Sequence, residues 1–160
     1  MLESVLLDAS FFLRFLNKND ELFSNADGYY KYFLDKEIAM VVSTISIAEF
    51  CVRGSIEELP LKNLQILPFN VGHARKTGVF ARVLFEAKQK GEIEQTERLL
   101  IPNDAKLFAQ ADQESKIKHF VTSDIRSLKP FTVLKTALDI KFDIINISQK
   151  HTEAFGTLGL

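Results

Sequence analysis

The feature that most constrains the fold is the alternation of short apolar runs with segments of helical periodicity. The apolar runs lie at residues 4–7, 38–43, 64–69, 119–123 and 142–147. Continuous apolar runs of this length, several of them rich in β-branched residues, are typical of strands that are buried on both faces. Segments with helix-like spacing lie between them, at residues 10–17, 27–36, 46–54, 71–89 and 103–118. Strands separated by helices predict a parallel sheet covered on both faces.

The bulk composition sets limits on what the protein does. The chain has 160 residues, 46% of them hydrophobic, which suits one folded domain with a core of its own. A formal net charge of −1 excludes a protein-wide positive field, so any contact with nucleic acid needs a local basic patch. The single cysteine, Cys51, cannot form an internal disulfide, which favours a reducing compartment, and we expect it to be a small core residue.

The chain shows no internal boundary that calls for two domains. We expect one domain over residues 1–148 and an appended tail over 149–160. The polar stretch 88–98, around Gly91, is interpreted as a loop or a frayed helix end within that domain. The N-terminal segment lacks the basic region and cleavage site of a signal peptide, and no apolar run is long enough to span a bilayer. We therefore expect a cytoplasmic protein that makes no membrane contact.

Four acidic residues stand at junctions between the predicted strands and helices: Asp8, Glu49, Asp104 and Asp124. The binding crevice of a parallel α/β sheet lies outside the carboxyl ends of its strands, so we expect these side chains to meet there. Two carboxylates about 4 Å apart repel by roughly 4 kcal/mol at an effective dielectric constant near 20. Such a cluster must take up protons or bind a cation. Ligands that are all oxygen atoms favour Mg²⁺ or Mn²⁺ over zinc.

Each acid also has a purely structural interpretation. Asp8 and Asp124 can cap the helices that come after them. Residues 46–49 match the capping box S-x-x-E. Asn103 can cap its helix while Asp104 complements the positive end of the helix dipole. These local roles do not explain why all four acids fall at one edge of the sheet, and we expect Asp104 to serve both purposes.

Four segments of the chain resemble, in order, the acidic motifs of PIN-domain ribonucleases, whose small bacterial members are the VapC-type toxins. These segments are VLLDASFFLRFLN, VVSTISIAEF, IPNDAKLFAQA and HFVTSD, and the resemblance covers roughly residues 4–147. The resemblance implies a three-layer α/β/α sandwich with a parallel sheet of four to five strands. It also implies an endoribonuclease that uses Mg²⁺ or Mn²⁺ to hydrolyse RNA phosphodiester bonds, as the toxin of a toxin–antitoxin pair.

The same resemblance suggests roles for individual residues. The catalytic and metal-binding acids are Asp8, Glu49, Asp104 and Asp124. In this hypothesis the three aspartates hold one or two metal ions, Glu49 completes the shell or orients a water, and no histidine or lysine base is needed. Thr122 and Ser10 match hydroxyl positions that support the acids, although either hydroxyl can instead be a local helix cap. Lys106 departs from the family pattern, because the family usually has an apolar residue there; its side chain either enters the site or faces solvent.

An acidic pocket also needs basic residues on its rim to hold the RNA backbone. The candidates are Arg14, Lys18, Arg53, Arg75, Lys76 and Arg82, of which we select Arg14, Arg53 and Arg75 as substrate-binding residues. For the three basic residues between 75 and 82, the face of a solvated helix is the competing interpretation.

Partners are suggested by an aromatic group and by the resemblance. Tyr29, Tyr30, Tyr32 and Phe33 exceed what one buried helix face needs, so we expect an exposed patch for self-association or for another protein. The resemblance implies a homodimer and an antitoxin protein that covers the active site.

Other functions fit the sequence less well. The main alternative is a non-catalytic PIN-like module that binds RNA or protein, against which the four intact acids argue. A haloacid-dehalogenase-like phosphatase needs a second aspartate where the chain has Ser10, and a receiver domain needs one within 64–72, where there is none. A dinucleotide-binding domain needs a glycine-rich loop after the first strand, and the segment DASFF has no glycine.

Overall fold

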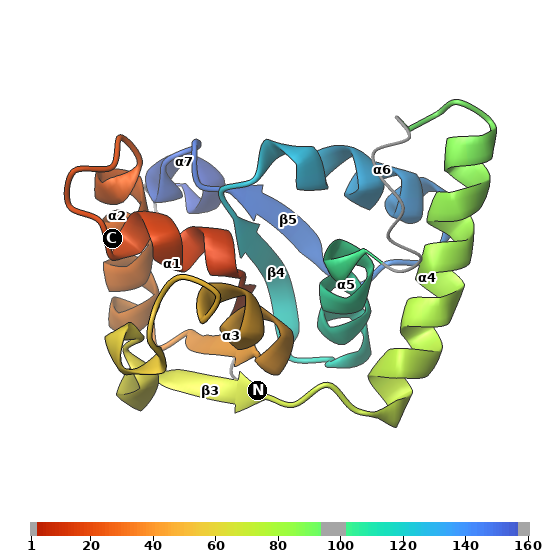
Figure 1. Cartoon of the computed structure of the whole chain (residues 1–160). Coiled ribbons are helices and arrows are strands. Elements are labelled where there is room, and N and C mark those ends of the chain that lie inside the picture. The colour runs from red at the N-terminus through yellow and green to blue at the C-terminus, as the bar shows by residue number, and fades with distance from the viewer. Residues whose placement is uncertain (1–2, 94–101, 157–160) are drawn as a thin grey trace.

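The centre of the molecule is a five-stranded sheet in which every neighbouring pair of strands is parallel. The computed structural model describes residues 3–93 and 102–156. The strands are β1 (Ser4–Leu7), β2 (Ala39–Ser43), β3 (Leu64–Leu67), β4 (Ile117–Thr122) and β5 (Asp143–Asn146), in the spatial order β3-β2-β1-β4-β5 (Figure 1). The predicted parallel sheet is confirmed, and β1 and β4 lie at its centre.

Helices cover both faces of the sheet, as the alternation of elements predicts. The helices are α1 (Ala9–Phe15), α2 (Phe23–Asp35), α3 (Thr44–Phe50), α4 (Val71–Gln89), α5 (Asn103–Gln113), α6 (Leu128–Ala137) and α7 (His151–Phe155). Short 3₁₀ turns are η1 (Ile56–Glu58), η2 (Leu61–Asn63) and η3 (Ile125–Ser127). Figure 1 shows α1, α2, α3 and α7 on one side of the sheet, with α4, α5 and α6 on the other.

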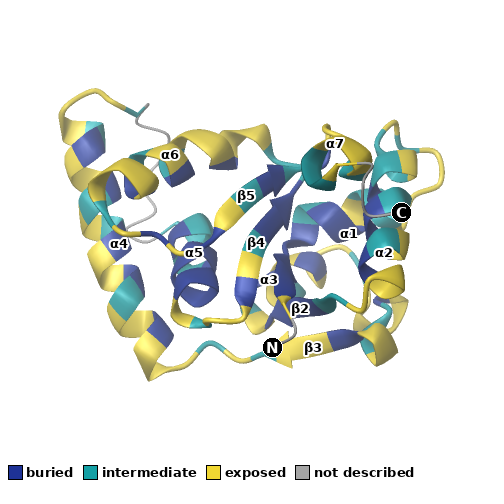
Figure 2. Ribbon diagram, turned by 180° about the vertical axis from the view of Figure 1, so that it is seen from behind, coloured by how far each residue is buried: buried dark blue, intermediate teal, exposed yellow. Residues whose placement is uncertain are grey.

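The burial of β1 shows why this strand is apolar throughout. Val5 and Leu7 pack into the core beneath α1 and α2. Leu6, which points to the opposite face, packs into the core beneath α4, α5 and α6. Figure 2 shows β1 and the C-terminal part of β4 buried, whereas the helices present exposed outer surfaces. The three-layer α/β/α sandwich is therefore confirmed.

Several helix boundaries differ from the predicted ones, among them those of α3, which spans Thr44–Phe50 instead of 46–54. Helix α2 begins at Phe23, earlier than the predicted 27–36. Helix α5 ends at Gln113 instead of Lys118, because β4 begins at Ile117 and takes the subsequent residues into the sheet. Helix α4 ends at Gln89 and is followed by Gly91 at φ 75°, and residues 94–98 of the predicted loop lie outside the described residues.

The aromatic group on α2 is buried, so the predicted exposed patch is wrong. Tyr29 and Phe33 are 0% exposed, and the ring of Tyr32 stacks on Phe155 of α7 with the centroids 4.8 Å apart. The Tyr29 hydroxyl also donates a hydrogen bond of 2.5 Å to the carbonyl oxygen of Gln149. The aromatic excess on α2 therefore serves to bind the C-terminal segment. The division into a domain over 1–148 and a tail over 149–160 stays a prediction.

Two further expectations concern exposure. Cys51 is exposed, contrary to the expectation of a core residue, because it comes after the end of α3, one position beyond the buried Phe50, and so leaves the buried face of that helix. In the described part of the chain, no helix combines the length and apolar character needed to cross a membrane.

Candidate active site

The ends of the two central strands supply two of the four acids. Asp8 follows β1 directly, and Asp124 lies two residues after β4, its neighbour in the sheet. Both carboxylates also cap the helical segments that begin after them, as their structural interpretation predicts. Asp8 Oδ1 accepts a hydrogen bond of 3.0 Å from the amide of Phe11, and Asp124 Oδ1 accepts one of 3.0 Å from the amide of Arg126. Capping fixes both carboxylates at this edge of the sheet.

Asp8 is a buried carboxyl group held by hydroxyls. Its side chain accepts hydrogen bonds of 2.6 Å from Ser10 Oγ, at Oδ1, and of 2.6 Å from Thr122 Oγ1, at Oδ2. Burial raises the pKa of Asp8 to about 7; the two hydroxyls and the Phe11 amide oppose this rise, and the charge of Asp104 adds to it. Ser10 and Thr122 therefore both contact the candidate catalytic acid, as predicted for supporting residues.

Asp104 lies in the first turn of α5 and comes close to the other acids. Burial raises its pKa, and the charge of Asp124 raises it further, while a 3.2 Å hydrogen bond from Ser127 Oγ and the charge of Arg126 lower it. The helix cap is Pro102, and Asn103 is the first helical residue, so the predicted cap by Asn103 is wrong. Asp104 thus stands at the positive end of the α5 dipole, as expected.

Glu49 reaches the site from α3. This helix begins directly after β2 and is capped by Ser43, whose Oγ accepts a 3.0 Å hydrogen bond from the Ile45 amide. The predicted capping box over residues 46–49 is therefore wrong, because the helix starts nearly one turn earlier. In the described structure, the buried Ser46 Oγ has no hydrogen-bond partner.

The surroundings of Glu49 connect it to α5. Glu49 is exposed, but partial desolvation still raises its pKa. A hydrogen bond from the Asn103 side chain and the charge of Lys106 lower this pKa, whereas the charge of Asp104 raises it. Lys106 also donates a 3.4 Å hydrogen bond to Asn103 Oδ1. Lys106 thus lies near Glu49 and Asn103 with intermediate exposure, and whether its side chain enters the site or faces solvent stays a prediction.

The four predicted acids therefore form one electrostatically coupled group. Asp104 is its centre, because the charge of Asp104 acts on Asp8 and Glu49, and that of Asp124 acts on Asp104. Within residues 3–93 and 102–156, no three histidine, cysteine, aspartate or glutamate side chains are close enough to hold a metal ion. The donor set consists of oxygen atoms alone, the chemistry that Mg²⁺ and Mn²⁺ prefer.

An arginine that the sequence analysis did not select binds one of the acids. The Arg126 side chain donates two hydrogen bonds to the Asp124 carboxylate, from Nε to Oδ1 at 3.0 Å and from Nη2 to Oδ2 at 3.1 Å. Partial burial of Asp124 acts to raise its pKa, but the hydrogen bonds and charge of Arg126 outweigh this and lower it. The spacing Asp-x-Arg at the start of a helix was the only signal in the sequence. Beside this pair, a cavity of about 540 Å³ opens between α1 and η3.

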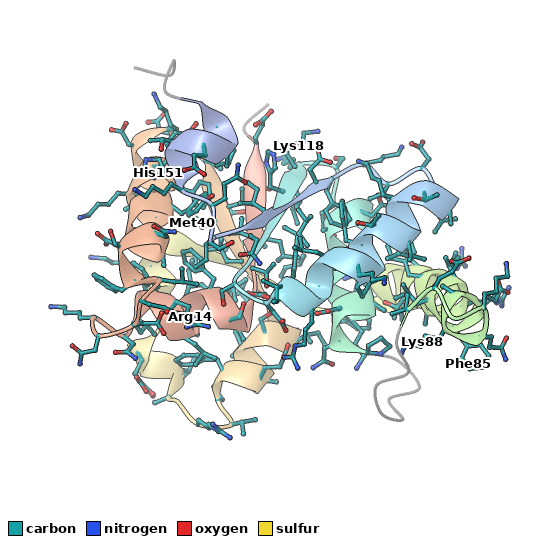
Figure 3. The ribbon with its side chains drawn as sticks, turned by 90° about the horizontal axis from the view of Figure 1, so that it is seen from above. Arg14, Met40, Phe85, Lys88, Lys118 and His151 are labelled. Atoms are coloured by element: carbon teal, nitrogen blue, oxygen red, sulfur yellow. The ribbon has the colours of Figure 1, made fainter. Side chains whose placement is uncertain are left out.

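The basic candidates are distributed over different surfaces. Arg14 lines the cavity beside Asp124 and forms a 2.9 Å ion pair with Asp20. Arg75 lines a second cavity, of about 590 Å³, at the C-terminal end of α5. Arg53 is exposed in the turn after α3. Figure 3 shows Arg14 on α1 at the opposite side of the molecule from the C-terminal part of α4. The structure thus places only Arg14 of the three selected residues on the cavity that borders the acids.

The three basic residues that were not selected lie outside that cavity. Lys76 forms a 2.7 Å ion pair with Asp112 near the C-terminal end of α5. Lys18 and Arg82 are exposed, in the turn after α1 and on α4 respectively.

Comparisons with known proteins find a likeness of fold. No family model matches the sequence, and no curated protein matches it. A chain of DNA-bound VapBC from Salmonella typhimurium is similar in structure, with a TM-score of 0.55 and 17% identity over 92% of this chain and 99% of that one. A chain of VapBC2 from Rickettsia felis, bound to a DNA fragment from their promoter, has a TM-score of 0.56 and 21% identity over 89% of this chain and 97% of that one. The chain has the PIN-like α/β/α fold of these VapC structures.

Proposed function

We propose that this protein is a metal-dependent endoribonuclease and the toxin of a toxin–antitoxin pair. The observation that carries the proposal is the gathering of Asp8, Asp104 and Asp124 at the carboxyl ends of β1 and β4, with Glu49 beside them, in a PIN-like fold. In the part of the chain that the structure describes, no lysine or arginine donates a hydrogen bond to Asp8 or Asp104. Carboxylates that are buried, as Asp8 is, or partly buried, as Asp104 is, and that have no bonded cation are suited to bind one.

The acids offer oxygen ligands, the kind that Mg²⁺ and Mn²⁺ prefer. No three of the described acids lie close enough to hold an ion as they stand, so binding of an ion would draw their side chains together. Asp8, Asp104 and Asp124 would hold the ion, and Glu49 would complete the shell or orient a water. When bound, such an ion lowers the pKa of a water and neutralises charge that develops on the phosphate oxygens. RNA phosphodiesters are the substrate class that this chemistry serves in the fold family.

The other residues of the site prepare the acids for this role. Ser10 and Thr122 each donate to a different oxygen of Asp8, which fixes the plane of its carboxyl group. The N-terminus of α5 stabilises negative charge on Asp104. Because burial raises the pKa of Asp8 to about 7, binding of a cation at neutral pH would displace a proton from this carboxyl group.

The proposed partner is an antitoxin protein. Both similar structures are VapBC complexes on DNA, and their likeness to this chain supports a partner of the same kind. A homodimer stays a prediction from the sequence resemblance.

One observation favours the alternative of a non-catalytic PIN-like module. Arg126 neutralises Asp124, so the protein itself supplies one positive charge at the acids. A module that binds RNA or protein without cleaving it needs no metal, and it would retain full binding when the ion is removed.

Cleavage of RNA by the purified protein separates the two functions. We expect cleavage with Mg²⁺ or Mn²⁺, none with EDTA, and none with Asp8→Asn or Asp104→Asn. Asp27→Asn is the matched control, because Asp27 is an acid in a surface ion pair with Lys31 on α2; it should cleave like the wild type. Full activity of the Asp8 and Asp104 variants, or of wild type in EDTA, would remove the acids from catalysis.

A further inference from the structure

We infer that Arg126 is a positioning residue that exchanges Asp124 for an RNA phosphate when a divalent ion binds the acids. In the structure, Arg126 neutralises Asp124; with an ion on Asp124, the guanidinium would instead hold the backbone of the substrate in the adjacent cavity. This inference rests on the proposed function. It extends that function by naming a residue that links the metal site to the site for RNA.

The Arg126 side chain is exposed and is held by few contacts. Its side chain is 87% exposed, whereas that of Asp124 is 28% exposed. The contacts that fix Arg126 in the structure are its two bonds to Asp124. An exposed arginine held at one point gives up that contact easily, because exposed ion pairs contribute little net stability.

The cavity beside Asp124 is suited to one nucleotide of an RNA strand. Its walls carry the guanidinium groups of Arg14 and Arg126, and its rim carries two exposed apolar side chains, Leu13 and Ile125. Arginine forks bind phosphate oxygens in pairs, and the apolar side chains offer a surface to a base. Asp124 is on the wall of the same cavity, so a strand that occupies it passes beside the acids.

The charges in the cavity change when an ion binds. In the structure each arginine is paired with one aspartate, Arg14 with Asp20 and Arg126 with Asp124. Asp20 is 15% exposed and also accepts a 2.8 Å bond from the Leu22 amide, so the first pair is fixed. A divalent ion on Asp124 takes the negative charge of the second pair and repels Arg126. The cavity then has a net positive charge that is free to bind a phosphate.

The Arg126→Gln variant should bind the metal ion more tightly and RNA more weakly, because Arg126 competes with the ion but contacts the RNA. Removing the competing cation should tighten Mn²⁺ binding, by roughly fivefold for an exposed pair. Removing the phosphate contact should raise the KM for RNA, with kcat at saturation largely retained. The slope of log kcat/KM against log salt should become shallower by about 0.7, the value for one lost phosphate contact on a single strand.

The test combines calorimetric titration of Mn²⁺ into the free protein with steady-state cleavage of a short RNA at several salt concentrations. Arg126→Lys keeps the charge and should restore the wild-type dependence of kcat/KM on salt, although lysine cannot form the two parallel hydrogen bonds of arginine. Lys31→Gln removes one positive charge from a surface ion pair on α2, where Lys31 is 73% exposed, and should leave both measurements unchanged.

The outcomes separate this inference from the proposed function. If wild type binds Mn²⁺ and cleaves RNA while Arg126→Gln matches it in Mn²⁺ affinity and KM, then Arg126 only forms a surface ion pair and the inference is wrong. Weaker Mn²⁺ binding by Arg126→Gln would also contradict it, since the guanidinium would then support the metal site. A wild-type protein that neither binds Mn²⁺ nor cleaves RNA would end the proposed function and this inference together.

Discussion

Helix α5 carries an aspartate near each end, and the protein treats the two differently. Asp104, in the first turn, lies among other acids and receives one 3.2 Å hydrogen bond from the Ser127 hydroxyl. Asp112, near the last turn, is 8% exposed and is bound by a cation. Lys76 Nζ donates to its Oδ2 at 2.7 Å, and the Lys141 amide donates to its Oδ1 at 2.8 Å.

Protein groups donate hydrogen bonds to both carboxylate oxygens of Asp112. Beside it, buried His73 accepts a 3.1 Å bond from the Asn70 amide at Nδ1 and contacts Glu114 at 2.8 Å through Nε2. Each of these polar groups at this end of α5 thus has a hydrogen-bond partner within the fold. At the other end, Asp8 and Asp104 face further acids. The two ends of α5 therefore differ in the cations that bind their acids: Lys76 binds Asp112, whereas no described lysine or arginine donates a hydrogen bond to Asp8 or Asp104.

The largest expected effect is that substitution of Asp104 abolishes cleavage but not stability, whereas substitution of Asp112 lowers stability but not cleavage. Asp104→Asn should fold normally and lose at least roughly a hundredfold in RNA cleavage, since a metal ion supplies several kcal/mol of transition-state stabilisation. Asp112→Asn should retain cleavage and lose roughly 2–3 kcal/mol of unfolding free energy, because it leaves Lys76 without its partner. Urea denaturation and a cleavage assay on both variants measure the exchange, and an inactive but stable Asp112→Asn would break the comparison.

The second effect concerns pH, and its sign is set by Asp8. The pKa of Asp8 is about 7 in the folded protein against an ordinary value of 3.8, so between these pH values the folded state holds a proton that the unfolded state has lost. The free energy of unfolding of the metal-free protein should therefore fall as pH rises through this window, by up to about 1.4 kcal/mol per pH unit, and level off above it. Asp104 and Glu49 act in the same direction.

Asp8→Asn isolates the contribution of Asp8 to this slope. The variant should show a shallower decline and should be more stable than wild type at pH 8, where the wild-type carboxylate is charged and buried. Denaturation of wild type and Asp8→Asn in EDTA from pH 4 to 8 provides the measurement. Equal slopes in Asp8→Asn and wild type would show that Asp8 titrates normally.

A smaller effect is expected for Thr122→Val, which keeps the shape of the side chain and removes the hydroxyl that donates to Asp8 Oδ2. Because this hydrogen bond lowers the pKa of Asp8, its loss should raise that pKa and move Mn²⁺ binding to higher pH. Calorimetric titrations at two pH values test this, and an unchanged pH dependence would assign Thr122 a packing role only.

The smallest effect is expected for Ser127→Ala, which removes the single protein hydrogen bond to Asp104 that the described structure shows. We expect a loss of about 0.5–1.5 kcal/mol in unfolding free energy and a modest decrease in Mn²⁺ affinity. A large loss of cleavage in this variant would mean that Ser127 itself takes part in the reaction.

The fold and the place of the acids could be predicted because both depend on local patterns. Buried parallel strands appear as apolar runs, and the parallel order alone places Asp8 and Asp124 at one edge. Asp104 was identified by its position at a helix start, which the structure confirms.

The remaining features depend on tertiary contacts that no local pattern encodes. The start of α3 at Thr44 was missed because Ser43 and Ser46 are both acceptable caps, and only the end of β2 selects between them. The burial of Tyr29 depends on α7, which is remote in sequence. The pairing of Lys76 with Asp112 likewise joins two helices and could not be distinguished from a solvated helix face.

The most direct test of the account is calorimetric titration of Mn²⁺ into wild type, Asp104→Asn and Asp112→Asn at neutral pH. The account predicts that wild type and Asp112→Asn bind Mn²⁺ with similar affinity and release protons, whereas Asp104→Asn shows no comparable binding. Equal binding by Asp104→Asn and wild type would contradict it, because the acids at the N-terminal end of α5 would then not be the metal site.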